Sequence, residues 1–178
     1  MKETRFMQVK RTFSLVCQVE VNIQAKPEVI WALLTNANSF ARWNSTVTGI
    51  DGVIREGERI RIHVPGTKRT FTPKVTDVVQ NEHMTWSDGL PMIFKGTRSF
   101  MLKPNDNGST LFIMKEHFHG LVFALVKGML PDFKGIFEAY ANDLRLEAER
   151  LDTDVDANQQ DNDERSMSTK QHRQEATR

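Results

Sequence analysis

The sequence contains a single cysteine and no apolar run long enough to cross a membrane, and each absence excludes a class of protein. Cys17 cannot form a disulfide within the chain, and in a strand-like segment a buried structural thiol is more common than a nucleophile. No stretch approaches the roughly 20 apolar residues that span a bilayer, and residues 1–13 lack the apolar segment of a signal peptide. We therefore expect a cytoplasmic protein without a transmembrane segment.

The sequence also has little net charge and none of the common catalytic motifs. The formal net charge is +1 and no basic stripe is interleaved with aromatic residues, so a nucleic-acid partner is disfavoured. There is no G-x-S-x-G, no glycine-rich phosphate loop and no evident Cys–His pair. His117 and His119 would share a strand face, but without a third ligand nearby a metal site is disfavoured. We expect no metal and no cofactor, and the sequence identifies no catalytic residue.

What the sequence does contain is enough apolar residues for one core. The chain has 178 residues, of which 39% are hydrophobic, including 11 Phe and 3 Trp. This length and composition predict one domain, which we place at residues 13–151. Residues 1–12 are interpreted as an N-terminal extension. Residues 152–178 are strongly polar and are expected to form a disordered tail, since they bury too little surface to offset the entropy of ordering.

The last apolar segment of the chain is predicted to be a helix that needs a partner surface. Between Pro131 and Leu151, apolar residues recur every three or four positions, with charged residues on the other faces. Proline is tolerated at the start of a helix. Because most of the preceding sequence has strand character, we expect this helix to lie against one sheet, with any ligand between them. The apolar stripe comprises Phe133, Phe137, Tyr140, Leu144, Ala148 and Leu151.

Upstream of this helix, the pattern predicts one strand, two short helices and then a run of strands. Residues 13–23 alternate between apolar and polar, as a half-buried strand does. Lys26-Pro27-Glu28 opens a helix, residues 35–39 interrupt it, and a second short helix covers residues 40–43. Further strands are predicted at residues 46–55, 58–64, 69–79, 82–87, 94–103 and 110–119, with a loop at residues 88–91.

Residues 120–130 form a helix-compatible run that is apolar nearly all round. We expect this run to cover the ligand space as a lid, with Gly120 and Gly128 as hinges. Contact with a membrane or a partner protein is the alternative.

Several phrases of the sequence, taken with this order of elements, resemble a known superfamily. They are residues 23–31 through 42–44, residues 96–102, Thr110 and residues 116–120. Over residues 13–151 the chain resembles the START-like (SRPBCC) superfamily and, within it, the polyketide cyclase/dehydrase-like domains. The resemblance implies an α+β helix-grip fold, in which a curved antiparallel sheet of about seven strands wraps around a long C-terminal helix. It also implies a cavity, which relatives use for lipids, polyketides and other apolar molecules.

Arg98 and Glu116 are predicted to form the polar end of this cavity. Arg98 alternates with Phe100 and Leu102, so it points inward if they do. A buried guanidinium needs an acceptor, and Glu116 lies on the next strand, across a tight hairpin. An exposed cross-strand ion pair is the alternative. Relatives of this type commonly have histidine where this chain has Arg98.

The remaining candidate residues are apolar or aromatic and are interpreted as the wall of the ligand site. The Tyr140 hydroxyl either reaches the ligand or is bonded to a backbone carbonyl within the core. The full set comprises Trp43, Phe71, Val75, Trp86, Arg98, Phe100, Phe112, Met114, Glu116, Phe118, Phe133, Phe137, Tyr140 and Leu144.

We interpret the sequence as that of a protein that binds a small hydrophobic molecule, such as a lipid, a polyketide or an aromatic metabolite. A cyclase or dehydratase acting on a polyketide-like substrate in the same cavity is the first alternative. It requires two convergent polar groups with shifted pKa values. A protein-interaction module with a filled cavity is the second. The sequence does not indicate an oligomeric state.

Overall fold

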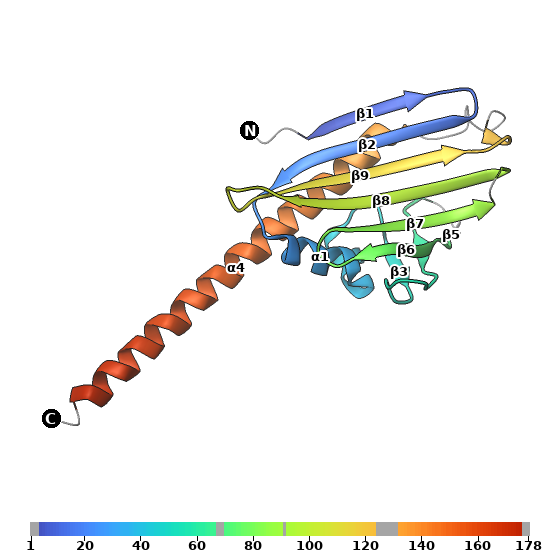
Figure 1. The fold of residues 1–178 in the computed structure, drawn as a ribbon. Helices are drawn as coiled ribbons and strands as arrows, with labels where there is room; N and C mark the ends of the chain where they lie inside the picture. The colour runs from blue at the N-terminus through green and yellow to red at the C-terminus, as the bar shows by residue number, and fades with distance from the viewer. Residues whose placement is uncertain (1–3, 67–69, 91, 124–131, 176–178) are drawn as a thin grey trace.

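A computed structural model describes residues 4–66, 70–90, 92–123 and 132–175 of the chain, and their side chains as far as residue 154. Within these ranges the chain forms two antiparallel sheets, two short helices after the second strand, and one long C-terminal helix (Figure 1). This is the predicted α+β helix-grip fold, which is therefore confirmed.

The larger sheet has six antiparallel strands in the order β1-β2-β9-β8-β7-β6. Apolar residues alternate along its central strands, and their buried faces all lie on the side that α4 covers. Helix α4 contacts β1, β2 and β9 of this sheet. The strands are β1 (Arg5–Lys10), β2 (Ser14–Ile23), β6 (Lys74–Val79), β7 (His83–Leu90), β8 (Phe94–Pro104) and β9 (Thr110–His119).

Strand β1 was not expected from the sequence, which assigned residues 1–12 to an extension outside the domain. β1 pairs with β2 along its whole length, from Arg5 opposite Glu20 to Lys10 opposite Leu15. Its inward-facing Phe6 packs edge-on against Phe137 of α4. The strand escapes detection because it is an edge strand that buries only one large side chain, and so shows little apolar alternation.

The helical region after β2 follows the prediction closely. Helix α1 (Pro27–Thr35) begins at the predicted proline, the 3-10 helix η1 (Ala37–Ser39) forms the interruption, and α2 (Phe40–Trp43) is the second short helix. Phe40 and Trp43 are both buried and anchor α2 to the core. Both helices contact α4, which brings Trp43 to the interface between sheet and helix.

The second sheet contains three short strands, β3 (Gly49–Asp51), β4 (Arg61–His63) and β5 (Thr70–Phe71). The predicted strands at 46–55 and 69–79 are too long. β3 ends at Asp51, and the following Gly52, with a φ of 102°, turns the backbone out of the strand. Pro73 separates β5 from β6, because proline has no backbone N–H to donate to a neighbouring strand. The Pro73 carbonyl oxygen still accepts a hydrogen bond from the backbone N–H of Ile60.

The predicted turn at residues 105–108 is confirmed, whereas the predicted loop at residues 88–91 is wrong over residues 88–90, which belong to a strand. The Asn105–Gly108 turn connects β8 to β9, whose bounds match the predicted strand. By contrast, β7 continues through Gly89 to Leu90, which pairs with Phe94. A Cβ atom at Gly89 would lie 2.2 Å from the Phe94 carbonyl oxygen, so only glycine fits here.

Helix α4 (Phe133–Glu175) carries the predicted apolar stripe, with Phe133, Phe137, Tyr140, Leu144 and Ala148 all buried. The predicted end of the helix at Leu151 is wrong, since α4 continues to Glu175 and runs away from the body of the protein (Figure 1). A helix beyond the core depends on its own propensity. The disorder expected for residues 152–178 stays a prediction. No helix in the described part of the chain is both long and apolar enough to cross a membrane.

Candidate functional site

A row of inward-facing side chains crosses the large sheet and positions the polar part of the candidate site. The strand register places Trp86 opposite Arg98, Arg98 opposite Glu116, and Glu116 opposite Cys17. Residues directly opposite one another on paired antiparallel strands point to the same face. The row therefore runs across the sheet from β7 to β2 on the side covered by α4.

Arg98 and Glu116 form the predicted ion pair within this row. The Arg98 Nε donates a hydrogen bond to Glu116 Oε2 over 2.9 Å, and the guanidinium Nη2 approaches the same oxygen. The two side chains are only 21% and 12% exposed, and the guanidinium carbon lies 5.7 Å from the centre of the Phe137 ring. The pair is thus on the concave face, beneath α4, and the alternative of an exposed pair is wrong.

The charges of this pair are balanced locally. Burial by itself would lower the pKa of Arg98. The adjacent Glu116 carboxylate raises this pKa by more, so the net shift is upward. Arg98 therefore remains protonated at any physiological pH and cannot act as a general acid or base.

Tyr140 lies on the inward face of α4, close enough for the Arg98 charge to act on it. Burial raises the pKa of the phenol, and the positive charge of Arg98 opposes this only in part. The hydroxyl is therefore a neutral hydrogen-bond donor. It has no hydrogen-bond partner among the described residues, which does not fit the alternative of a bond to a backbone carbonyl.

Cys17 ends the polar row, and its thiol is fully buried. Burial and the nearby Glu116 carboxylate raise its pKa to about 11. We expect the native protein to react negligibly with an aromatic disulfide reagent at pH 8, because the reagent cannot reach the buried thiol and the thiol stays protonated at this pH. One thiol should react rapidly in denaturant, because Cys17 is the only cysteine. Rapid labelling of the native protein in stopped-flow measurements would contradict the buried position.

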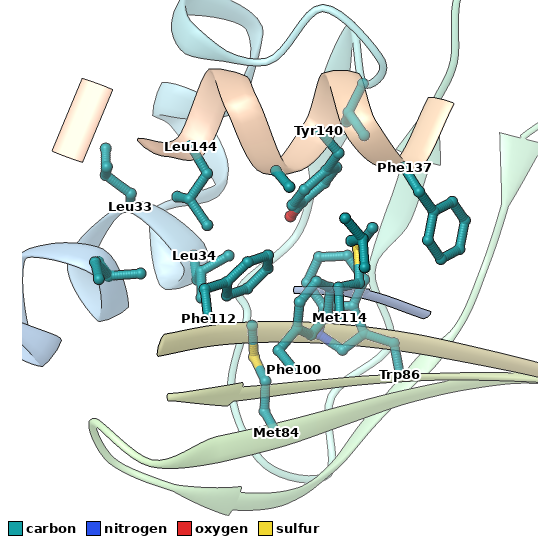
Figure 2. Close-up of a cluster of buried hydrophobic side chains, with 14 of the residues drawn as sticks. Leu33, Leu34, Met84, Trp86, Phe100, Phe112, Met114, Phe137, Tyr140 and Leu144 are labelled. Atoms are coloured by element: carbon teal, nitrogen blue, oxygen red, sulfur yellow. The ribbon is translucent and has the colours of Figure 1, made fainter. Parts of the chain in front are cut away.

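Aromatic side chains from α2, the sheet and α4 meet next to this row. The rings of Trp86 and Phe100 are 4.7 Å apart, and those of Trp43 and Tyr140 are 5.8 Å apart. Figure 2 shows Tyr140 reaching from α4 toward the side chains of the sheet. Eight of the predicted wall residues are buried there together: Trp43, Trp86, Phe100, Phe112, Met114, Phe137, Tyr140 and Leu144.

The other predicted wall residues differ in position. Val75 is buried, whereas Phe118 and Phe133 stack with ring centres 5.2 Å apart near the start of α4. Phe71 was wrongly grouped with Val75, because Pro73 interrupts the strand. Phe71 instead lies in β5 of the small sheet and is 41% exposed.

Phe40 was omitted from the predicted site although it contacts both Trp43 and Trp86. Its position three residues before Trp43 on one helical turn was the available signal.

The histidines lie outside this arrangement. The His117 and His119 rings are 4.8 Å apart, and burial, His119 and Lys115 together lower the pKa of His117. In the part of the chain that the structure describes, no three side chains of His, Cys, Asp or Glu gather as metal ligands do. His63 Nε2 lies 2.9 Å from Asp51 Oδ2, a pairing between strands that the sequence did not indicate.

The predicted lid at residues 120–130 lies mostly outside the described residues, so its position is not compared with the prediction. Gly120 itself has a φ of 132°, and an added Cβ would lie 2.3 Å from the Ile93 carbonyl oxygen. This position therefore requires glycine.

Comparisons with known proteins agree with the fold. Residues 15–149 match the family model described as polyketide cyclase/dehydrase and lipid transport. Similar solved structures include a START superfamily protein from Mycobacterium smegmatis, with 17% identity, a TM-score of 0.57, and coverage of 76% of this chain and 98% of that chain. The protein MLL2253 from Mesorhizobium loti has 20% identity and a TM-score of 0.58, over 76% of this chain and 98% of that chain.

A third similar structure is that of CalU16 from Micromonospora echinospora, with 16% identity and a TM-score of 0.57, over 83% of this chain and 75% of that chain. At these identities the likeness concerns the fold alone. No curated protein matches the sequence.

Proposed function

Because the chain belongs to the polyketide cyclase/dehydrase and lipid transport family, with the fold of the START superfamily, we propose that it binds a small hydrophobic molecule between the large sheet and α4. The ligand is a lipid, a polyketide or an aromatic metabolite, taken up in the cytoplasm. Apolar and aromatic side chains predominate at this interface, as they do in most small-molecule sites.

The observation that carries the proposal is a change of burial along the inward faces of β8 and β9. Leu102, Phe100, Phe112 and Met114 are almost completely buried. Farther along the same faces the ion pair is partly exposed, and Phe94 and Phe118 are only half-buried. The interior thus becomes more accessible toward the end of the sheet near the start of α4. We propose that the ligand enters there, past the stacked rings of Phe118 and Phe133.

The ion pair at this end supports a binding role. Apolar residues of similar size would often stabilise a fold as well as a half-buried ion pair does, so such a pair is weak evidence of a role in stability. A pair that faces an accessible end of an apolar interior instead offers one polar anchor to a ligand that is otherwise hydrophobic.

Neither alternative function is favoured by a specific observation. A cyclase or dehydratase needs a group with a pKa near the working pH, whereas the pKa values of Arg98 and Tyr140 are shifted further from neutrality. For a protein-interaction module, the absence of a bound molecule in cells would be the distinguishing result.

Gly96 offers a direct test, because it faces inward at the proposed entrance. An added Cβ atom would meet the Phe118 ring at 3.4 Å, which is ordinary contact, so Gly96→Val should fold and narrow the entrance. We expect native mass spectrometry of the wild-type protein, purified from its own cells, to show one bound molecule per chain. Gly96→Val should weaken binding at least about tenfold, equivalent to about 1.4 kcal/mol of binding free energy, and so lower the bound fraction.

The matched control is Gly49→Val in β3 of the small sheet, where an added Cβ would meet only the His63 ring, at 3.9 Å. This variant should retain the bound molecule. Equal occupancy in wild type and Gly96→Val would contradict entry at this end, and a wild-type protein without any bound molecule would count against the binding function itself.

A further inference from the structure

Three segments of the chain are hydrogen-bonded together at one end of the large sheet. They are the connection between β1 and β2, the residues that precede β8, and residues 120–123, which follow β9. The backbone N–H of Gly120 donates to the Phe13 carbonyl oxygen over 3.2 Å, and the N–H of Leu121 donates to that of Met92 over 2.9 Å. Figure 1 shows β1, β2, β8 and β9 meeting these segments at the end of the sheet opposite to the one where α4 leaves the body of the protein.

Large apolar side chains are exposed on all three segments. Met92, Leu121 and Leu90 are 76%, 66% and 63% exposed, more than any other large apolar side chain that the structure describes. Ile93 and Phe13 are more than half exposed as well. We call these five side chains the apolar tip. Single exposed apolar residues are normal on a protein surface, but several on neighbouring segments mark an interaction surface.

The charged groups around the apolar tip are mainly positive. Lys10 and Arg11 are exposed just before Phe13, and Lys95 follows the tip on β8. The acidic residues at this end of the described chain include Asp88 and Asp132. Each accepts a hydrogen bond from a backbone N–H group, at 2.8 and 3.1 Å, which compensates part of its charge. An anionic partner therefore suits this end of the molecule.

The turns at the opposite end of the large sheet have a different composition. Residues 80–82 and 105–108 include Glu82 and Asp106, and contain no basic residue and no large apolar residue. The net charge of the whole chain is only +1, so the positive charge beside the apolar tip results from local placement. The two ends of the sheet thus differ in both polarity and charge, as expected for a protein that docks through one of them.

We propose that the apolar tip docks reversibly on an anionic lipid membrane. Its side chains enter the boundary between lipid headgroups and acyl chains, and the neighbouring basic residues contact the anionic headgroups. A fluid lipid surface accepts side chains from three separate connections without a matching shape, whereas a protein partner needs a complementary surface.

This proposal goes beyond the proposed function, because docking does not depend on what the interior binds. The apolar tip lies at the same end of the sheet as the proposed entrance. Docking therefore brings that entrance to the membrane surface.

The test measures binding of the full chain to sedimented lipid vesicles. Vesicles rich in phosphatidylglycerol are compared with vesicles of phosphatidylcholine alone at low ionic strength. We expect binding to the anionic vesicles to be at least about tenfold tighter, because each basic residue near an anionic surface favours the bound state. High salt should reduce this difference, because it screens the attraction.

Two sets of substitutions separate the apolar contact from the charge. Met92→Ser combined with Leu121→Ser should weaken binding to the anionic vesicles at least about tenfold, because both positions lose apolar surface that the membrane would bury. Arg11→Gln should weaken binding about fivefold and reduce its dependence on salt.

The matched controls are exposed residues of the same kinds elsewhere on the molecule. Val53→Ser combined with Leu146→Ser changes two apolar side chains that are also more than half exposed but lie outside the tip. Lys103→Gln removes an exposed positive charge toward the other end of β8. Both controls should bind vesicles as the wild type does. The melting temperature of each variant verifies that it is folded.

The outcomes distinguish docking from other uses of the tip. Wild-type protein that does not bind the anionic vesicles would overturn the proposal, as would an equal loss of binding in the tip variant and its apolar control. Equal binding to both kinds of vesicle would overturn the anionic class of membrane. If the tip substitutions changed the mass of the protein in analytical ultracentrifugation but not its vesicle binding, the tip would instead be an interface between copies of this chain. Occupancy of the interior is measured separately, with Gly96→Val, so either proposal can fail without the other.

Discussion

Replacing Phe112 with alanine is expected to lower the free energy of unfolding by about 4 kcal/mol, the largest effect we predict for a single substitution. Phe112 is fully buried, and its ring stacks on those of Phe100 and Tyr140. It therefore joins β9 to both β8 and α4. Alanine would remove most of the apolar surface at this junction and leave a cavity that the surrounding rings cannot fill without moving.

Chemical denaturation monitored by circular dichroism measures this loss. Met101→Ala is the matched control, because Met101 lies on β8 of the same sheet but is 40% exposed on the opposite face. It should change the unfolding free energy by less than about 1 kcal/mol. A loss below about 1 kcal/mol for Phe112→Ala would contradict the close packing of sheet against helix.

Replacing Glu116 with alanine is expected to cost about 3 kcal/mol, because it leaves the Arg98 guanidinium partly buried without a counter-charge. The partial exposure of Arg98 keeps the effect at the lower end of the range for buried pairs. The double variant Arg98→Leu, Glu116→Leu should recover most of this loss, since two apolar side chains can replace the pair without leaving a charge.

The exposed pair Arg55–Glu58 provides the control for this effect. Glu58→Ala should cost less than about 1 kcal/mol, as is usual for ion pairs in water. If Glu116→Ala and Glu58→Ala had equal effects in the same denaturation experiment, the inward placement of the Arg98–Glu116 pair would be wrong.

The Arg98–Glu116 contact could be predicted from the sequence because it depends on local rules. The two strands are joined by the Asn105–Gly108 turn, so their pairing follows from the hairpin, and Pro104 lies opposite Thr110. Alternation with Phe100 then assigns Arg98 to the inner face. The bounds of β9 and the helix–break–helix after β2 were predictable for the same reason.

The contacts of Trp43 with Phe40 and Tyr140, and of Phe40 with Trp86, could not be predicted in this way. They depend on how α2 packs against β7 and α4, which begin 40 and 90 residues after Trp43, as the numbers of His83 and Phe133 show. No periodicity within a segment encodes such a contact. Edge strand β1 escaped prediction, and the short strands of the small sheet were predicted too long, because each buries too few side chains to produce a clear pattern.

The measurement that tests the central claim most directly is nuclear magnetic resonance of the three indole N–H groups during titration with 1-tetralone. The account predicts that the signals of Trp43 and Trp86, whose side chains are buried between the sheet and α4, shift and saturate, while the signal of Trp31 on α1 stays in place. Signals of Trp43 and Trp86 that do not move up to the solubility limit of the ketone would contradict a ligand site between the sheet and α4.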